Sequence, residues 1–146
     1  MKLKDIDFRV WSKLENGYIE YPALAKLGSV LPAKVHRADR AIPFIEFDER
    51  DDEKEVEFWT GLRDLNNAKI YEGDIVEITN HRFKDTIEAV VIWQQGGFFM
   101  KVIKTYDEDE VCVGKEIPFS EVHSYSQQID LVVIGNIHEN PELLGY

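Results

Sequence analysis

Two long segments rich in valine, isoleucine and aromatic residues, joined by a pair of glycines, constrain the fold of this chain more than any other feature. Residues 86–95 read Thr-Ile-Glu-Ala-Val-Val-Ile-Trp-Gln-Gln, and residues 98–104 read Phe-Phe-Met-Lys-Val-Ile-Lys. β-Branched and aromatic side chains favour extended backbone, and a two-residue glycine turn between such segments is typical of a β-hairpin. We therefore predict an antiparallel hairpin with Gly96-Gly97 as its turn.

Further short strands follow from the alternation of apolar and polar residues. Residues 74–79 form a strand with both faces largely covered, and residues 131–134 form a continuous apolar run that predicts a buried central strand. Residues 111–113 and 117–119 are short strand candidates on either side of Gly114. About five strands with short turns and little helix predict a mainly β chain.

We expect a single domain over residues 1–146, with a small SH3-like β-barrel in residues 57–146. Closure of a barrel removes the exposed edges that several short apolar strands would otherwise leave. Residues 1–56 are predicted to form a variable, irregular, β-rich N-terminal part with short helical turns.

The N-terminal part contains several local signals. Residues 6–10 alternate as a half-buried strand, and Asn16-Gly17 is a strong hairpin turn. Proline and glycine at the two ends of residues 22–27 predict one or two helical turns, and residues 42–47 predict an edge strand. Two further helical turns are expected in the second half of the chain, over residues 120–123 with Ser120 as cap and over residues 140–145 with Asn140 as cap.

The composition limits the classes of partner. The chain has 146 residues and a net charge of −11, and its acidic residues concentrate in residues 46–57 and 105–146. Binding to a phosphate backbone needs clustered lysine and arginine, so nucleic acid is not an expected partner. Its single cysteine, Cys112, forms no internal disulfide, and no apolar run of membrane-spanning length is present. We expect a cytoplasmic protein.

Catalytic and metal-binding patterns are not found in the sequence. The four histidines are far apart, and a zinc site needs three or four convergent ligands. Cys112 lies between two valines, where a thiol is usually inert packing. The acidic runs at residues 48–52 and 107–110 do not have the ligand spacing of a calcium loop and are predicted to be solvated loops. We expect no metal, no cofactor and no enzymatic activity.

Four stretches of the chain resemble the YopX family of phage and prophage proteins. The family signature is matched by Thr-Gly-Leu-Arg-Asp at residues 60–64 and by Lys-Ile-Tyr-Glu-Gly-Asp-Ile-Val at residues 69–76. The other three stretches are Phe8 to Trp11, Val91 to Trp93 followed by Gly97-Phe98, and residues 133–143. The resemblance implies a phage or prophage origin, a β-rich fold and self-association. It implies no activity, because the family has no established biochemical function.

The sequence departs from the family pattern at a few positions. Asn67-Ala68 stands where the family usually has Asn-Gly, and His138 replaces the usual tyrosine. Residues 12–56 match no stretch of the family, so the resemblance assigns no detail to them.

Five residues within these motifs are candidates for a binding site: Tyr71, Glu72, Asp74, Asn136 and Glu139. Structural roles are favoured for all of them. Gly73 is predicted to adopt a positive φ, and the Asp74 carboxylate is predicted to accept backbone N–H groups and close that turn. We expect Tyr71 to have a hydrogen-bonded hydroxyl, Asn136 to bridge backbone groups, and Glu139 to belong to a cap and first helical turn. The alternative is that Glu72 and Asp74 form a carboxylate pair for metal binding or acid–base chemistry.

The favoured function is a non-enzymatic protein-interaction or self-assembly module, in which exposed aromatic residues or a strand edge contact a protein or a second copy. Three alternatives are a nucleic-acid-binding SH3-like barrel, an acidic decoy that imitates DNA before a host DNA-binding protein, and an enzyme with scattered carboxylates. The negative charge argues against the first and favours the second. Four aromatic residues that could stack on bases are instead expected in the core: Trp59, Trp93, Phe98 and Phe99.

Overall fold

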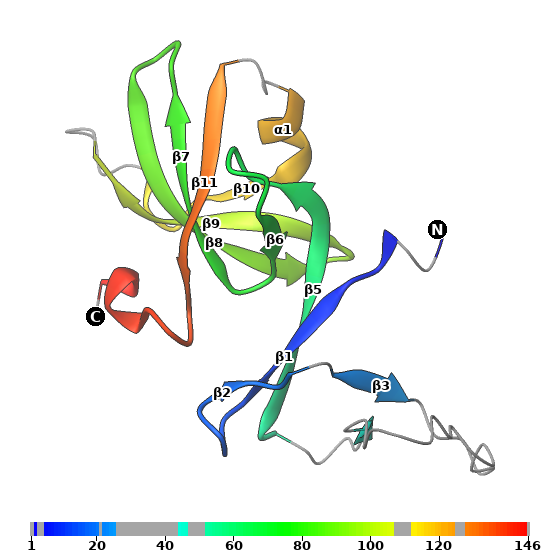
Figure 1. Ribbon diagram of the computed structural model, residues 1–146. Helices are drawn as coiled ribbons and strands as arrows, with labels where there is room; N and C mark the ends of the chain where they lie inside the picture. The colour runs from blue at the N-terminus through cyan, green and yellow to red at the C-terminus, as the bar shows by residue number, and fades with distance from the viewer. Residues whose placement is uncertain are drawn as a thin grey trace. The chain divides into compact units, whose positions relative to one another are not determined.

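The structure is a computed structural model in which the chain is mainly β and divides into two compact units. It describes residues 2, 5–20, 22–25, 44–46, 52–106, 112–124 and 128–145. Residues 9–57 form one unit, here called the N-terminal unit, and residues 1–8 with 58–146 form the other, called the sheet unit (Figure 1). Of the acidic loops predicted at residues 48–52 and 107–110, all but the exposed Asp52 lies outside the described residues.

A five-stranded antiparallel sheet forms the centre of the sheet unit, with the strand order β10-β9-β8-β7-β11 (Figure 1). Its strands are β7 (Asp74–Asn80), β8 (Asp85–Gln94), β9 (Gly97–Thr105), β10 (Glu116–Pro118) and β11 (Ile129–Asn136). Among the described residues, the outer strands β10 and β11 are not paired with each other. The sheet is therefore described as a row of five strands, and its closure into an SH3-like barrel stays a prediction.

The hairpin predicted for the two apolar segments is confirmed as β8 and β9, with a shift of one residue in the turn. Gln94 pairs with Gly97, so the two turn residues are Gln95 and Gly96 rather than the two glycines. Gln95 has a φ of +49° and Gly96 a φ of +79°. Tight hairpin turns of this kind need a positive φ at both central positions, which matches the twist of the flanking strands.

Strand β11 contains the predicted apolar run, but it is an outer strand and not the central one. Its residues up to Gly135 are only half buried. The loop after β5 (Lys54–Arg63) covers its outer edge: the Leu65 N–H donates to the Leu131 carbonyl oxygen at 2.9 Å. Because a loop covers this edge, β11 can contain a continuous apolar run without having a strand on each side. The prediction of a central strand for residues 131–134 was therefore wrong.

The core of the sheet unit consists of apolar side chains from alternate positions of the sheet strands, together with residues from two neighbouring elements. These elements are β6 (Lys69–Tyr71) and the helix α1 (Phe119–Ser124). The helix confirms the predicted helical turn, but it begins at Phe119, so Ser120 lies within the helix and is not its N-cap. The buried cluster contains Ile70, Val76, Ile78, Ala89, Val91, Met100 and Phe119. Alternation on a pleated strand places every second side chain on one face, so this cluster also determines the register of β7 and β8.

The prediction of a strand over residues 111–113 is wrong for residues 112 and 113, the part of this segment that the structure describes. Cys112 begins a short turn and is exposed, and Val113 is 51% exposed. Gly114 has a φ of +84°, and its N–H donates to the Val102 carbonyl oxygen at 2.8 Å. The chain thus turns beside β9 before pairing with it from Glu116 onward, so Cys112 is not the buried thiol that was predicted.

Strand β5 begins in the N-terminal unit and ends in the sheet unit, where it pairs with β6. Trp59 pairs with Tyr71 and Arg63 with Lys69, and the register shifts between these pairs. Gly61 lies in this irregular stretch with a φ of +88°. An unpaired residue of this kind bends the strand and increases its twist.

The N-terminal unit contains the predicted hairpin, formed by β1 (Phe8–Ser12) and β2 (Gly17–Tyr18). Ser12 pairs with Gly17, so the loop spans residues 13–16 and is longer than a two-residue turn. The Ser12 hydroxyl accepts the Glu15 N–H at 3.2 Å within this loop. A side-chain acceptor of this type stabilises a wider turn than the Asn-Gly signal alone implies.

The helical turns predicted over residues 22–27 are wrong for the residues that the structure describes there. Strand β3 (Ala23–Ala25) pairs in parallel with β4 (Phe44–Glu46), which lies within the strand predicted over residues 42–47. Pairing with a segment distant in sequence overrides the local proline and glycine signals.

No helix of the described residues has both the length and the apolar character needed to cross a lipid bilayer.

Candidate functional site

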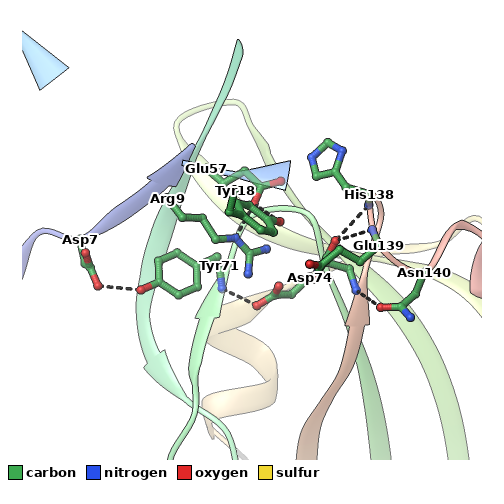
Figure 2. Close-up of polar contacts among 10 residues, drawn as sticks. Asp7, Arg9, Tyr18, Glu57, Tyr71, Asp74, His138, Glu139 and Asn140 are labelled. Atoms are coloured by element: carbon green, nitrogen blue, oxygen red, sulfur yellow. Dashed lines mark hydrogen bonds and ion pairs between the residues drawn. The ribbon is translucent and has the colours of Figure 1, made fainter. Parts of the chain in front are cut away.

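The turn between β6 and β7 has the predicted conformation and contains three of the five candidate residues. Gly73 has a φ of +79°, and its N–H donates to the Val91 carbonyl oxygen at 2.9 Å. The Asp74 side chain is 2% exposed, and its Oδ2 accepts the Tyr71 N–H at 2.8 Å (Figure 2). Glu72 is half buried in the same turn, and its N–H donates to the Phe58 carbonyl oxygen at 3.0 Å. Asp74 therefore closes the turn.

Asn136 holds the turn that follows β11, also as predicted. Its Oδ1 accepts the N–H groups of His138 at 3.0 Å and Glu139 at 2.9 Å, and its Nδ2 donates to Glu139 Oε2 at 2.7 Å. Asn136 is also the pairing partner of Asp74 across β11 and β7. The fold therefore places Asp74 and Asn136 on neighbouring strands and Glu139 against Asn136.

Asn140 does not cap the last helical turn with its side chain, which corrects one prediction. The 3₁₀ helix η3 (Pro141–Leu144) has Asn140 at its N-cap position without a capping hydrogen bond from the side chain. Instead, the Asn140 Oδ1 accepts the Asn136 N–H at 3.3 Å (Figure 2). A Cβ at Gly135 would lie 2.6 Å from this oxygen, so the absence of a side chain at Gly135 leaves room for the contact.

Tyr71 contacts a residue that the sequence did not indicate. Its hydroxyl donates to Asp7 Oδ2 at 2.6 Å, as predicted for a bonded hydroxyl (Figure 2). Lys69 forms an ion pair with the same oxygen. Burial tends to raise the pKa of Asp7, but hydrogen bonds from Lys69, Tyr71 and the Phe8 N–H together lower that pKa below its ordinary value. Asp7 and Tyr71 are 64 positions apart, so no local pattern links them.

Asp64 holds the signature loop, residues 64–68 between β5 and β6, to the sheet, and it was not among the candidate residues. Its side chain is buried, and its Oδ1 accepts the N–H groups of Asn66 at 2.9 Å and Ala68 at 2.8 Å. The other oxygen, Oδ2, accepts the Val133 N–H from β11 at 3.0 Å. One carboxylate thus satisfies three backbone donors, which is a structural arrangement and not a reactive one.

Another buried carboxylate lies in the N-terminal unit. Glu57 is 3% exposed, and its Oε2 accepts the Arg9 Nε at 2.5 Å and the Tyr18 hydroxyl at 3.1 Å (Figure 2). The Arg9 guanidinium also lies 4.7 Å from the centre of the Tyr18 ring. A buried carboxylate needs such partners because removing it from water is costly.

The arrangement of these polar groups supports turns and strand contacts. In the part of the chain that the structure describes, no group of three or more histidine, cysteine, aspartate or glutamate side chains is placed to hold a metal ion. Asp74 and Asn136 use side-chain oxygens to accept backbone N–H groups, and Glu139 accepts from Asn136. Their geometry can hold hairpins, and it does not gather their carboxylates around an open site.

An open groove in the sheet unit is the feature that sequence reasoning missed. Its volume is about 480 Å³. It lies between the end of β5, the signature loop, α1 and β11, and most of its lining side chains are apolar. The described lining residues are Trp59, Gly61, Leu62, Arg63, Asp64, Leu65, Ile70, Phe119, Val122, Ile129 and Leu131. The only signal in the sequence was an apolar residue, Leu65, within a polar turn, and it is 65% exposed.

Several aromatic side chains are also exposed in the sheet unit. One of them is Trp93, for which core packing was predicted. Trp93 is 52% exposed and packs edge-on against Phe98, with ring centres 4.8 Å apart. Phe83 is 63% exposed and Tyr106 is 56% exposed. Trp59 is half buried and forms part of the groove wall, where its Nε1 donates to the Leu62 carbonyl oxygen at 2.7 Å.

Comparison with known proteins identifies the family. The model of the YopX protein family matches residues 7–145. The crystal structure of protein EF1440 from Enterococcus faecalis is similar to this chain, with a TM-score of 0.48 and 22% sequence identity over 95% of this chain and 97% of that chain. No curated protein matches the chain. The family match includes all four stretches that resemble the family and extends over residues 12–56, for which the resemblance had given no match, and the chain therefore belongs to the YopX family.

Proposed function

We propose that this protein is a non-enzymatic interaction module that docks a segment of a protein partner in the groove of the sheet unit. The observation that carries the proposal is the groove itself, which is open, largely apolar and bordered by the exposed Leu65. Its volume of about 480 Å³ falls in the range of sites that hold compact ligands or anchoring side chains. Burial of one leucine-sized side chain contributes about 1.5–3 kcal/mol.

The roles of the polar candidates support a non-enzymatic function. Asp64, Asp74 and Asn136 direct side-chain oxygens toward backbone N–H groups, which leaves these oxygens engaged in structure. General acid–base catalysis needs a titratable group within reach of a substrate proton. The groove offers apolar contact instead, which suits recognition.

Selection of a displayed random peptide library on the whole protein tests this function. We expect enriched peptides to bind the wild type and to lose about tenfold affinity on Leu65→Asp, since a charge would replace an apolar contact. Phe83→Asp is the matched control, because Phe83 is 63% exposed against 65% for Leu65 and does not line the groove. No enrichment, or equal loss with both variants, would contradict groove docking.

We place the protein in the cytoplasm of a bacterial host, give it a phage or prophage origin and an SH3-like barrel over residues 57–146, and expect self-association. The single cysteine supports a reducing compartment. Light scattering at low and high salt tests self-association, with a mass above that of one chain as the expected result.

Two alternative functions predict different binding results. A gel shift of DNA or RNA at low salt would favour a nucleic-acid-binding barrel. Competition with DNA for a basic host protein would favour the acidic decoy, for which the net charge of −11 is the supporting observation. Neither result is expected from a module that recognises peptides through the groove.

A further inference from the structure

We propose that the groove selects an apolar anchor residue with a neighbouring carboxylate, and that Arg63 recognises the carboxylate. The inference rests on the proposed function and specifies the chemistry of the partner segment. Among the described residues that line the groove, Arg63 is the only basic one. Apolar lining side chains provide the floor for the anchor, including Ile70 at 1% and Phe119 at 8% exposure.

The position of the Arg63 guanidinium is set by two contacts. Its Nη1 donates to the Asn67 carbonyl oxygen at 2.8 Å, and its Cζ lies 5.9 Å from the centre of the Trp59 ring. Asn67 has a left-handed backbone conformation, with a φ of +67°, in the turn that directs its carbonyl oxygen toward Arg63. Trp59 is fixed in turn by its hydrogen bond to Leu62. A cation held in this way loses less side-chain entropy when it binds an anion.

Arg63 keeps most of its donors for a ligand. An arginine side chain has five N–H donors, and the Asn67 carbonyl oxygen is the one hydrogen-bond acceptor that Arg63 has among the described residues. No described carboxylate pairs with it. The planar donor fork of a guanidinium matches a carboxylate with two parallel hydrogen bonds.

The neighbouring charges do not supply an equivalent site. Asp64 also lines the groove, but its carboxylate accepts three backbone N–H groups and is buried. Lys69 lies 4.9 Å from the centre of the Trp59 ring, but its ammonium is paired with Asp7. Arg63 is therefore the cation of the groove that a carboxylate can reach.

The overall charge of the protein makes the proposal specific. A chain with a net charge of −11 attracts basic peptides and repels acidic ones at long range. Enrichment of acidic residues in a peptide selection would therefore report a close contact and not the general field. The contact is expected at the groove, because this is where the apolar floor and Arg63 occur together.

The experiment compares peptide selections on three versions of the full chain: the wild type, Arg63→Gln and Arg82→Gln. Arg82 is the matched control, since it is exposed and lies over an aromatic ring, that of Phe83, at 5.4 Å, but does not line the groove. We expect the wild type and Arg82→Gln to enrich peptides with an aliphatic or aromatic residue next to Asp or Glu. Arg63→Gln is expected to enrich apolar peptides without the acidic residue.

Affinities of one enriched peptide and of its amide analogue, with Asn or Gln for the acid, give the quantitative test. We expect the amide change to weaken binding to the wild type about tenfold or more, and to have little effect on Arg63→Gln. Melting curves of both variants establish that they are folded, and Arg63→Lys, which keeps the charge without the fork, should give an intermediate loss.

Each outcome separates the two proposals. Enriched peptides that bind through Leu65 but show no acidic preference would overturn the role of Arg63 and leave groove docking supported. An acidic preference that persists on Arg63→Gln would also overturn it. No enrichment on any version would contradict the proposed function itself.

Discussion

The two units bury carboxylates for different purposes. In the sheet unit, Asp64 and Asp74 lie at turns and accept mainly backbone N–H groups close in sequence, with the Val133 N–H of β11 as a distant donor to Asp64. In the N-terminal unit, Glu57 lies within a strand and accepts from two side chains, those of Arg9 and Tyr18. The first arrangement holds a loop conformation, whereas the second holds strands together through a charge pair.

One buried carboxylate of the sheet unit is intermediate between these two arrangements. Glu88 is 4% exposed in the middle of β8 of the sheet unit and resembles Glu57 in its position within a strand. It accepts from the Tyr106 hydroxyl and from Lys104 Nζ at 3.3 Å. Both units therefore contain a buried glutamate within a strand that accepts from side chains. The two units differ in the turns around the sheet, where buried aspartates fix the loop conformation by accepting backbone N–H groups.

The largest effect is expected for Asp64→Ala. Removing the carboxylate takes away the acceptor of three backbone N–H groups, those of the exposed loop residues Asn66 and Ala68 and that of Val133 in β11. A backbone donor that loses its acceptor costs free energy, and most where water cannot replace the acceptor. We expect the free energy of unfolding to fall by about 3 kcal/mol. Chemical denaturation measures this change, and Glu20→Ala, at an exposed position, serves as the control. A loss similar to that of the control would remove the structural role assigned to Asp64.

Glu57→Ala tests the other side of the comparison. The substitution leaves the Arg9 guanidinium without its closest carboxylate, although the 23% exposure of the Arg9 side chain allows partial hydration. We expect a loss of about 2 kcal/mol, less than for a fully buried pair. Hydrogen exchange should show that the rate of amide exchange increases mainly within residues 9–57.

The matched control is Glu55→Ala on the same strand. Glu55 pairs with Lys13 at 2.7 Å, but their side chains are 40% and 53% exposed, and exposed pairs contribute about 0–1 kcal/mol. Equal effects of the two substitutions would show that burial does not distinguish Glu57.

Gly73→Val examines backbone conformation in the turn closed by Asp74. Gly73 has a φ of +79°, which a β-branched residue adopts only with strain. We expect a loss of at least about 1 kcal/mol in the free energy of unfolding. Gly97→Val in β9 is the control, because Gly97 does not have a positive φ and valine favours a strand. An unchanged melting midpoint for Gly73→Val would argue against strain at this turn.

The smallest effect concerns the pH dependence contributed by Asp7. Its pKa is lowered in the folded protein, so its stabilising contribution is present above the ordinary value of 3.8 and is lost as the pH falls through the folded value. Because the side chain is 34% exposed, we expect only about a few tenths of a kcal/mol. The difference in unfolding free energy between wild type and Asp7→Asn should shrink from pH 6 to pH 3. A constant difference across this range would contradict the lowered pKa.

The sequence predicted the turn chemistry of the candidate residues because that chemistry is local. Gly73 adopts a positive φ, and the side chains of Asp74 and Asn136 accept backbone N–H groups within three residues; the residue types alone indicate such roles. The contact between Tyr71 and Asp7 was not predicted, because it joins residues 64 positions apart. The outer position of β11 was also missed, since an apolar run is compatible with a central strand or with a strand covered by a loop.

By itself, the amino-acid sequence determined the β character of the chain, the main hairpin and the turns of its signature, because side-chain alternation and the φ preferences of glycine and asparagine act over a few residues. Only the tertiary structure decided which charged groups meet and that Arg63 and Trp59 border an apolar groove with α1 and β11. A groove is formed by side chains from segments far apart along the chain, and its shape depends on packing that no local pattern encodes.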